Sequence, residues 1–240
     1  MTIQLLCGDC LELMKQIPSG SVDAVVTDPP WITSSVNITS RLKGVAKTYN
    51  PTTSMEYGFI GEWKEDAISE ILRITKNDVF IISGYKEMPR LLPLCDPLRG
   101  IFVWHKTNGM LPLMYPARID VAFVVWTGRH STLYGKEIWK SMVWTHANPV
   151  AGCFATERIL EQNSGKAAHP CQGPLSLYMR IVSALPDGCT ILDPFMGSGT
   201  TGVACVQTGR SFIGFEIDKG YFEIAKRRIE EAQLQTRMAI

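Results

Sequence analysis

An acidic residue followed by two prolines and a tryptophan ends one of the most apolar segments of the chain. The segment Val22–Thr27 runs directly into Asp28, Pro29, Pro30 and Trp31. Consecutive prolines end a strand and present a rigid turn. A carboxylate beside a proline carbonyl gives two acceptors for one NH2 group, and the indole can stack on a planar ring. We therefore predict a pocket for the exocyclic amine of a nucleobase, with Asp28, Pro29, Pro30 and Trp31 as catalytic residues. A purely structural strand exit is the alternative.

A glycine-rich segment later in the chain has the spacing of a nucleotide-binding loop. Gly197, Gly199 and Gly202 form the pattern G-x-G-x-x-G between an apolar run and a predicted helix, and Glu216 ends the next apolar run. Such glycines let the backbone approach a ligand, and the acid can bind ribose hydroxyls. The pattern fits any adenosine-bearing cofactor, so an NAD-dependent dehydrogenase is one alternative. The late position of the motif disfavours it, because only one more strand and helix are expected to follow.

Strands and helices that alternate along the chain must position these two motifs. Apolar runs predict strands at Ile3–Leu6, Val22–Thr27, Val79–Ser83, Ile101–Trp104, Val121–Trp126, Thr190–Leu192 and Ser211–Phe215. Amphipathic or helix-favouring segments predict helices at Cys10–Gln16, Gly61–Ile74, Leu175–Ala184, Thr200–Thr208 and Lys219–Gln235. This alternation predicts an α/β fold with a mostly parallel sheet. Ligands of such sheets bind at the carboxyl ends of the strands, where both motifs begin.

Two segments depart from the alternation. Residues 32–60, rich in Thr, Ser and Asn, predict a mobile loop after the catalytic motif, and residues 127–168 predict an insertion. Among the basic residues in these two segments, the candidates are Arg41, Lys43, Lys47, Arg129, Lys136 and Lys140. They suggest contacts with a polyanion, although an ordinary solvated surface is the reading that charge alone favours.

The two motifs together resemble the amino-methylating DNA methyltransferases of the permuted β class, in which the DPPY/F/W block precedes the cofactor block. The stretch Leu5-Leu6-Cys7-Gly8-Asp9-Cys10 is similar to the N-terminal strand of that family. The stretch His169-Pro170-Cys171-Gln172-Gly173-Pro174 is similar to its HPxQKP block, with Gly173 in place of the usual lysine. The resemblance covers nearly the whole chain. It implies one domain over residues 1–240, with a doubly wound, Rossmann-like sheet of about seven strands, one of them antiparallel.

The resemblance also implies S-adenosylmethionine as the cofactor and double-stranded DNA as the substrate. The residues that it places around the cofactor are Asp9, His169, Gln172, Asp193, Phe195, Gly197, Ser198, Gly199, Thr200, Thr201 and Glu216. Asp193 has an alternative role, in which it orders its own loop by accepting hydrogen bonds from backbone amides. Asp218 is expected to cap the last helix. The six basic residues named above become candidate DNA contacts, with residues 127–168 as the target-recognition segment.

The identity of the methylated base depends on two residues of the catalytic motif. An aspartate at position 28 resembles the motif of the adenine-N6 enzymes, whereas cytosine-N4 enzymes usually carry serine there. Trp31 leaves cytosine-N4 methylation as an alternative. A non-catalytic subunit with the same fold is a third alternative, which Gly173 favours weakly. A homodimer and a cognate restriction enzyme stay open as partners.

The amino-acid composition limits the remaining classes of protein to which the chain could belong. The chain is 45% hydrophobic and 20% charged, with a net charge of +1 and a mean hydropathy of +0.04, as expected of a soluble domain. No apolar run approaches the roughly 20 residues that span a bilayer, and no signal sequence opens the chain. We expect a cytoplasmic protein, bacterial or phage-encoded, with no membrane partner and no metal. The 7 cysteines are scattered, which favours free thiols; the Cys7–Cys10 spacing is that of a redox motif, but it falls within the family's N-terminal strand.

Overall fold

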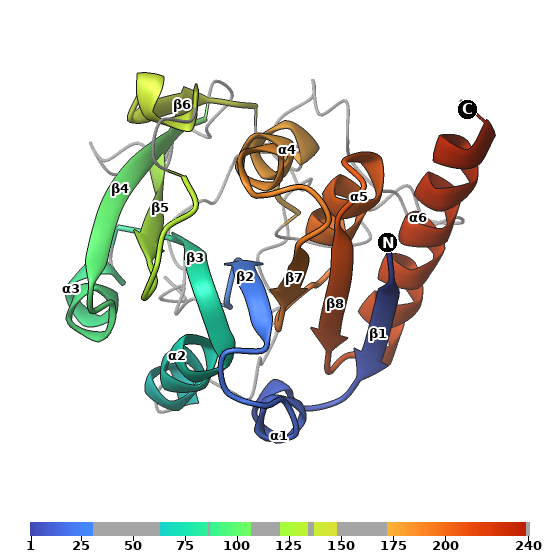
Figure 1. Ribbon diagram of the computed structural model, residues 1–240, viewed down its shortest axis with the longest axis horizontal. Coiled ribbons are helices and arrows are strands. Elements are labelled where there is room, and N and C mark those ends of the chain that lie inside the picture. Colours follow the sequence, from blue (N-terminus) through green and yellow to red (C-terminus); the bar gives the residue numbers. More distant parts are fainter. Residues whose placement is uncertain (31–62, 86, 107–120, 134–136, 148–171, 239–240) are drawn as a thin grey trace, which may run out of the picture.

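Eight strands form a single sheet in the part of the chain that the structure describes (Figure 1). The structure is a computed structural model, and it describes residues 1–30, 63–85, 87–106, 121–133, 137–147 and 172–238. The strands are β1 (Ile3–Cys7), β2 (Val22–Thr27), β3 (Thr75–Ser83), β4 (Leu98–His105), β5 (Val121–Thr127), β6 (Val143–Thr145), β7 (Thr190–Asp193) and β8 (Ser211–Glu216). Their order across the sheet is β1-β8-β7-β2-β3-β5-β4-β6.

The sheet is mostly parallel, as predicted. Among the described strands only β5 is antiparallel, and it pairs with β3 on one side and β4 on the other. All seven predicted strands are present. The additional strand is β6, a three-residue edge strand that pairs with the end of β4. It lies within the predicted insertion, where so short a run carries no recognisable alternation.

Helices cover both faces of the sheet (Figure 1). They are α1 (Cys10–Lys15), α2 (Trp63–Ile74), α3 (Met88–Leu91), α4 (Leu175–Ala184), α5 (Thr200–Gln207) and α6 (Lys219–Met238), with short 3-10 turns η2 (Leu92–Leu94) and η3 (Glu137–Lys140). One apolar core lies between the sheet and α4, α5 and α6, and a second lies between the sheet and α1, α2 and α3. The five predicted helices are confirmed; α3 and the 3-10 turns are too short for a periodic signal. No helix of the described segments has the length and hydropathy of a membrane span.

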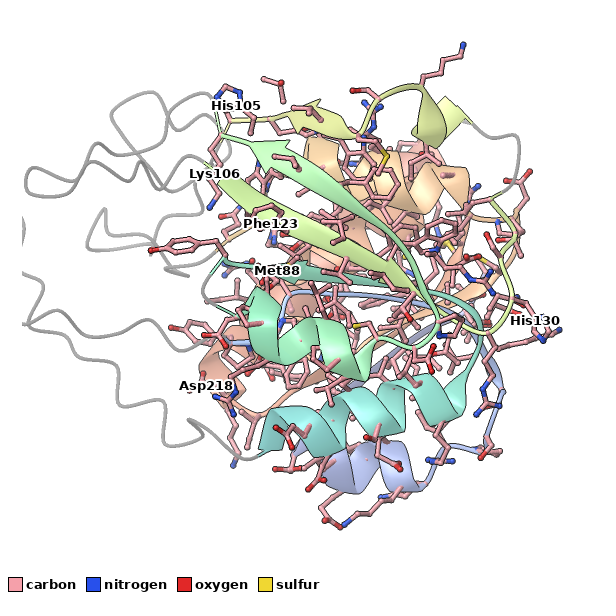
Figure 2. All side chains as sticks on the ribbon, turned by 90° about the vertical axis from the view of Figure 1, so that its left-hand side faces the viewer. Met88, His105, Lys106, Phe123, His130 and Asp218 are labelled. Atoms are coloured by element: carbon pink, nitrogen blue, oxygen red, sulfur yellow. The ribbon has the colours of Figure 1, made fainter. Side chains whose placement is uncertain are left out.

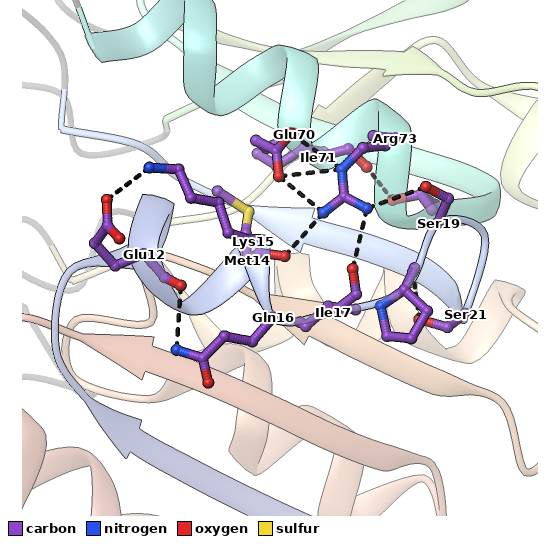
Figure 3. A network of polar contacts seen from close by, with 12 residues as sticks. Glu12, Met14, Lys15, Gln16, Ile17, Ser19, Ser21, Glu70, Ile71 and Arg73 are labelled. Atoms are coloured by element: carbon purple, nitrogen blue, oxygen red, sulfur yellow. Dashed lines mark hydrogen bonds and ion pairs between the residues drawn. The ribbon is translucent and has the colours of Figure 1, made fainter.

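An arginine on α2 holds the turn that leads into β2 (Figure 3). The guanidinium of Arg73 donates to the carbonyl oxygens of Met14 at 2.9 Å and Ile17 at 3.0 Å, and to the hydroxyl of Ser19 at 3.0 Å. Glu70, one helical turn earlier, accepts from the same group at 2.8 Å. Since one planar cation satisfies several acceptors in fixed directions, the start of β2 is held firmly against α2.

The sheet has a topological switch point between β2 and β7. From β2 the chain continues to β3 on one side, whereas from β7 it continues to β8 on the other side. Crevices at such points are the usual ligand sites of open α/β sheets. Asp28 follows β2, and Asp193 ends β7. The two predicted motifs therefore meet at the carboxyl edge of the sheet, which we call the catalytic edge.

The N-terminal strand lies beside the last strand. β1 pairs with β8 in parallel, and Cys7 at the end of β1 is opposite Glu216 at the end of β8. This pairing is the one that a permuted order of motifs requires, because it brings the Asp9 turn next to the glycine-rich loop.

The described part of residues 127–168 packs into the same domain. Trp144 of β6 is fully buried, and its ring stacks on Phe102 of β4 with centroids 4.2 Å apart. Buried Asp78 accepts hydrogen bonds from the indole of Trp126 at 2.9 Å and from the Thr132 hydroxyl at 2.7 Å. The segment after β5 is thus attached to the core.

Candidate active site

The catalytic motif leaves β2 at the catalytic edge. Thr27, the last residue of the strand, is buried, Asp28 is half-buried, Pro29 is buried and Pro30 is exposed. Trp31 lies outside the described residues. Because the strand is pinned before the motif and prolines follow it, the Asp28 carboxylate and the Pro29 carbonyl are held in a restricted geometry.

Asp193 is a buried carboxylate that joins the two motifs. One of its oxygens accepts from the Thr27 hydroxyl at 2.7 Å and from the backbone N–H of Phe195 at 3.1 Å. The other oxygen accepts from the Thr201 hydroxyl at 2.6 Å. The bonds to Phe195 and Thr201 are those of a residue that orders its own loop, which is the alternative role expected for it. Burial raises the pKa of Asp193 to about 6, and the Thr201, Thr27 and Phe195 donors oppose that shift.

The glycine-rich loop runs from Pro194 to the start of α5. Gly197 and Gly199 have φ angles of 50° and 80°, which favour glycine. The backbone N–H of Gly197 donates to Glu216 at 3.0 Å. Arg228 of α6 donates to the Ser198 carbonyl oxygen and reaches the Thr200 hydroxyl at 3.3 Å. Two neighbouring elements, β8 and α6, therefore fix the loop.

Gly199 is needed for packing as well as for backbone freedom. A Cβ on it would lie 2.9 Å from the Cβ and 3.0 Å from the Cα of Ala225 in α6. The glycine pattern therefore has a structural reason, close contact between the loop and α6, beside the predicted approach to a ligand.

Three carboxylates surround the turns after β1 and β8. Asp9 caps α1 by accepting from the N–H of Leu11 at 2.8 Å, and Asp218 caps α6 by accepting from the N–H of Tyr221 at 2.9 Å, as expected for Asp218. Glu216 accepts from Gly197 and, at 2.8 Å, from the Asp218 N–H. Burial raises the pKa of Glu216.

The donors and acceptors at this corner fit an adenosine-bearing cofactor. A carboxylate offers about four lone-pair positions, and the two hydrogen bonds to Glu216 use part of that capacity. Glu216 and Asp9 can therefore still accept hydroxyl and amine hydrogens. In the described segments, no three His, Cys, Asp or Glu side chains are grouped as metal ligands.

The thiols at this corner do not resemble a redox pair. Cys7 is exposed at the end of β1, and Cys10 begins α1. Burial raises the pKa of the Cys10 thiol to about 12, so it stays protonated and unreactive at neutral pH. All five cysteines within the described residues are free.

Gly173 faces a tyrosine that takes up the space of a side chain. Gln172 and Gly173 are buried just before α4, whereas His169 lies outside the described residues. A Cβ on Gly173 would lie 2.4 Å from Cε2 and 2.8 Å from the hydroxyl oxygen of Tyr178. Tyr178 is itself buried, and burial, followed by the charges of Asp28 and Asp193, raises its pKa well above the usual value. The aromatic ring therefore occupies the space that a side chain at position 173 would need.

We expect Gly173→Ala to lower the free energy of unfolding by about 2 kcal/mol, because the new Cβ overpacks a rigid buried ring. In a Tyr178→Leu background the same change should cost clearly less, since Leu lacks the contacting Cε2 atom. Urea unfolding of the two single variants and the double variant measures this coupling. Strictly additive losses would contradict the proposed fit of ring and glycine.

The predicted DNA contacts that the structure describes are scattered. Arg129 and Lys140 are exposed, whereas Arg41, Lys43, Lys47 and Lys136 lie outside the described residues. Because β5 is antiparallel, Arg129 at its end lies at the opposite edge of the sheet from Asp28. Figure 2 shows Asp218, Met88, Lys106 and His105 on one side and His130, next to Arg129, on the other.

Three residues that contact the site were not singled out from the sequence. Thr27 and Tyr178 lie within predicted apolar elements, and Arg228 lies among several charged residues of α6. Thr27 and Arg228 contact residues that lie 166 and 30 positions away in the chain, whereas Tyr178 contacts the nearby Gly173.

The comparisons with known proteins identify the family. The family model N6_N4_Mtase, described as DNA methylase, matches residues 22–227. The chain belongs to this DNA methylase family. The match spans both the Asp28 motif and the glycine-rich loop, and the family comprises N6 and N4 amino-methyltransferases without distinguishing the two.

Individual DNA methylases resemble the whole chain. The type II methyltransferase M.HinfI of Haemophilus influenzae is 29% identical over 254 residues, covering 95% of this chain and 68% of its own length. The crystal structure of the M1.HpyAVI–SAM complex has a TM-score of 0.64 at 24% identity, covering 95% of this chain and 99% of the other. PvuII DNA methyltransferase, described as cytosine-N4-specific, has a TM-score of 0.65 at 16% identity over 98% of this chain and 92% of its own. The two structures support the fold.

Proposed function

We propose that this DNA methylase transfers a methyl group from S-adenosylmethionine to the N6 amine of adenine in double-stranded DNA. The observation that carries the proposal is the meeting of Asp28-Pro29-Pro30 and the glycine-rich loop at the switch point between β2 and β7. A site for an amine acceptor thereby adjoins a site for an adenosine-bearing donor.

The acceptor amine is a poor nucleophile because its lone pair is delocalised into the base. The Asp28 carboxylate and the Pro29 carbonyl accept its two hydrogens, which directs the lone pair toward the methyl donor. Asp28 is also the nearest acceptor for the proton that the methylated amine gives up. Holding both reactants in line supplies up to about 7–11 kcal/mol of the barrier reduction in favourable cases.

The cofactor corner is built from the residues around the ends of β1, β7 and β8. Bound S-adenosylmethionine supplies a methyl group on a positively charged sulfonium, so the leaving group is already activated. We propose that Glu216 holds the ribose, that Asp9 lies near the adenine, and that Phe195–Thr200 and Gln172 line the rest. We propose that Asp193 orders the loop through Thr201 and that His169 lies beside the methionine end.

The target amine must leave the duplex to reach Asp28. Extruding a base costs about a few kcal/mol, which stacking on an aromatic side chain offsets in part. Trp31 is proposed for that stacking, with residues 32–60 closing over the base and residues 127–168 contributing to target recognition.

Adenine is proposed over cytosine because an aspartate, rather than the serine usual in cytosine-N4 enzymes, stands at position 28. The test is incubation of the purified protein with unmethylated bacterial DNA and methyl-tritiated S-adenosylmethionine, followed by nucleoside digestion and mass spectrometry. N6-methyladenine is the expected product. N4-methylcytosine would retain the chemistry and overturn the base assignment, as Trp31 leaves open. Absence of transfer despite cofactor binding would favour the non-catalytic subunit.

Lys106 is proposed as a DNA contact at the catalytic edge. It follows β4, whose direction is that of β3, and its ammonium group lies 4.6 Å from the centre of the Trp104 ring. We expect Lys106→Gln to weaken DNA binding across all sequences and to reduce the salt dependence by about one phosphate contact.

Arg129→Gln is the matched control, because it removes the same charge at the opposite edge. Fluorescence anisotropy with a labelled duplex over a salt series measures both variants. If Arg129→Gln weakens DNA binding and Lys106→Gln leaves it unchanged, DNA does not bind at the catalytic edge beside Lys106. That result would favour Arg129, the contact predicted from the sequence.

A further inference from the structure

A buried hydrogen bond connects the two halves of the active site. The Thr27 hydroxyl donates to Asp193 at 2.7 Å, and the residues lie 166 positions apart in the chain. Thr27 is 0% exposed and Asp193 is 3% exposed. Both groups are thus shielded from water. In such a buried place a hydrogen bond to an ionised acceptor is stronger, and its loss costs more free energy, than at the surface.

The position of this bond gives it a role beyond stabilising the fold. Thr27 is the residue directly before Asp28, and Asp193 is the last residue of β7, directly before the glycine-rich loop. The second oxygen of Asp193 accepts from Thr201 in the first turn of α5 at 2.6 Å. One carboxylate therefore holds the end of the catalytic strand on one oxygen and the cofactor loop on the other.

Two considerations separate this link from ordinary core packing. Backbone pairing between β2 and β7 involves Ala24 with Ile191 and Val25 with Leu192, and it stops before Thr27 and Asp193. Beyond that point the side-chain bond continues the connection between the strands. An error of about 1 Å in the relative placement of two reactants can cost on the order of 100-fold in rate, so a connection at this position bears directly on methyl transfer.

We propose that Thr27 is a positioning residue, which sets the catalytic Asp28 turn in register with the cofactor loop through Asp193. The inference rests on the proposed function, since register matters only if Asp28 accepts the target amine while the loop holds the donor. Thr27 itself touches neither reactant in this account.

Asp193 performs this role as a carboxylate, because both of its oxygens then accept. Burial raises the pKa of Asp193 to about 6, and the hydroxyl of Thr27 lowers it. Three other groups interact electrostatically with Asp193. They are Glu216 of β8, Tyr178 of α4 and Cys205 of α5. Loss of the Thr27 donor leaves these neighbours unchanged and should move the pKa of Asp193 upward.

Thr27→Val and Thr201→Val form a matched pair for the test. Each removes one hydroxyl from the same carboxylate and keeps the size of the side chain. We expect Thr27→Val to lower kcat by about 10-fold, with little change in the Kd for S-adenosylmethionine. Thr201→Val should instead weaken cofactor binding. Thr27→Ser, which restores the hydroxyl, should recover most of the rate.

The pH profile adds a readout that a packing role would not move. The acid limb of kcat should lie near pH 6 in the wild type and shift to higher pH in Thr27→Val, with Thr27→Ser returning it. Single-turnover methyl transfer, calorimetric titration with S-adenosylmethionine and urea unfolding are measured on each variant. A Thr27→Val protein with the wild-type rate and pH profile would overturn the proposal. Equal losses in Thr27→Val and Thr27→Ser would overturn it too, since restoring the hydroxyl would then not recover the rate.

Failure of the proposed function gives a different result. In that case the wild type itself transfers no methyl group to DNA. The coupling fails separately, when the wild type transfers methyl groups and the Thr27 variants do so equally well.

Discussion

Replacing Asp28 with alanine is expected to reduce the methyl transfer rate by about 10³-fold, the upper range for loss of a single preorganised polar group. The amine would lose its carboxylate acceptor, and its lone pair would stay delocalised into the base. Because Asp28 is half-buried and stands beyond the last residue of β2, folding should be retained. Single-turnover transfer of a tritiated methyl group measures the rate, and calorimetry measures cofactor affinity.

Two variants bracket this result. Asp28→Asn keeps the shape and one acceptor oxygen but brings an NH2 group toward the target amine, so we expect a loss of about 10²-fold. Asp187→Ala removes a carboxylate that is 98% exposed before β7 and pairs with Arg210 at 2.8 Å, and it should leave the rate unchanged. Activity of Asp28→Ala close to that of the wild type would refute the catalytic assignment, whatever the other variants do.

Replacing Gly199 with alanine is expected to lower the free energy of unfolding by about 3 kcal/mol. A left-handed φ of 80° costs about 1 kcal/mol for a residue with a side chain, and overpacking adds about 2 kcal/mol. The overpacking is hard to relieve, because the new Cβ would lie 3.0 Å from the backbone Cα of Ala225 rather than from the end of a flexible chain. Urea unfolding measures the difference.

Gly209→Ala is the control that isolates the packing contribution. Gly209 has a similar φ of 73°, but no atom lies within 4 Å of a Cβ built on it. Gly209→Ala should therefore lower the free energy of unfolding by only about 1 kcal/mol. Equal losses at the two positions would mean that φ alone explains the glycine and that the contact between the loop and α6 is unimportant.

The fold could be predicted from the sequence where patterns are local. Apolar runs such as Val22–Thr27 and Ser211–Phe215 are long enough to indicate strands, and Lys219–Gln235 has a clear helical period. The edge strand Val143–Thr145 gave no signal, because a three-residue run has no measurable alternation. Its assignment depends on pairing with β4, which is a tertiary contact.

The candidate site divides in the same way. Asp28, Asp193 and Gly199 could be recognised from their residue types and spacing in the sequence. The partners that hold them could not, because Thr27, Tyr178 and Arg228 read as ordinary core or surface residues until the fold brings them to the site. The place of Arg129 at the opposite edge from Asp28 was not predictable either, because it depends on the antiparallel direction of β5; its contact with DNA stays a prediction.

The most direct test is the nucleoside composition of genomic DNA from a bacterial host that lacks adenine methylation and expresses this chain. Mass spectrometry should find N6-methyladenine with the wild type and none with Asp28→Ala expressed to the same level. N6-methyladenine that persists in the Asp28→Ala host would contradict the assignment of the catalytic edge. No modified base in either host, with soluble protein that binds S-adenosylmethionine, would contradict the account of this chain as an adenine methyltransferase.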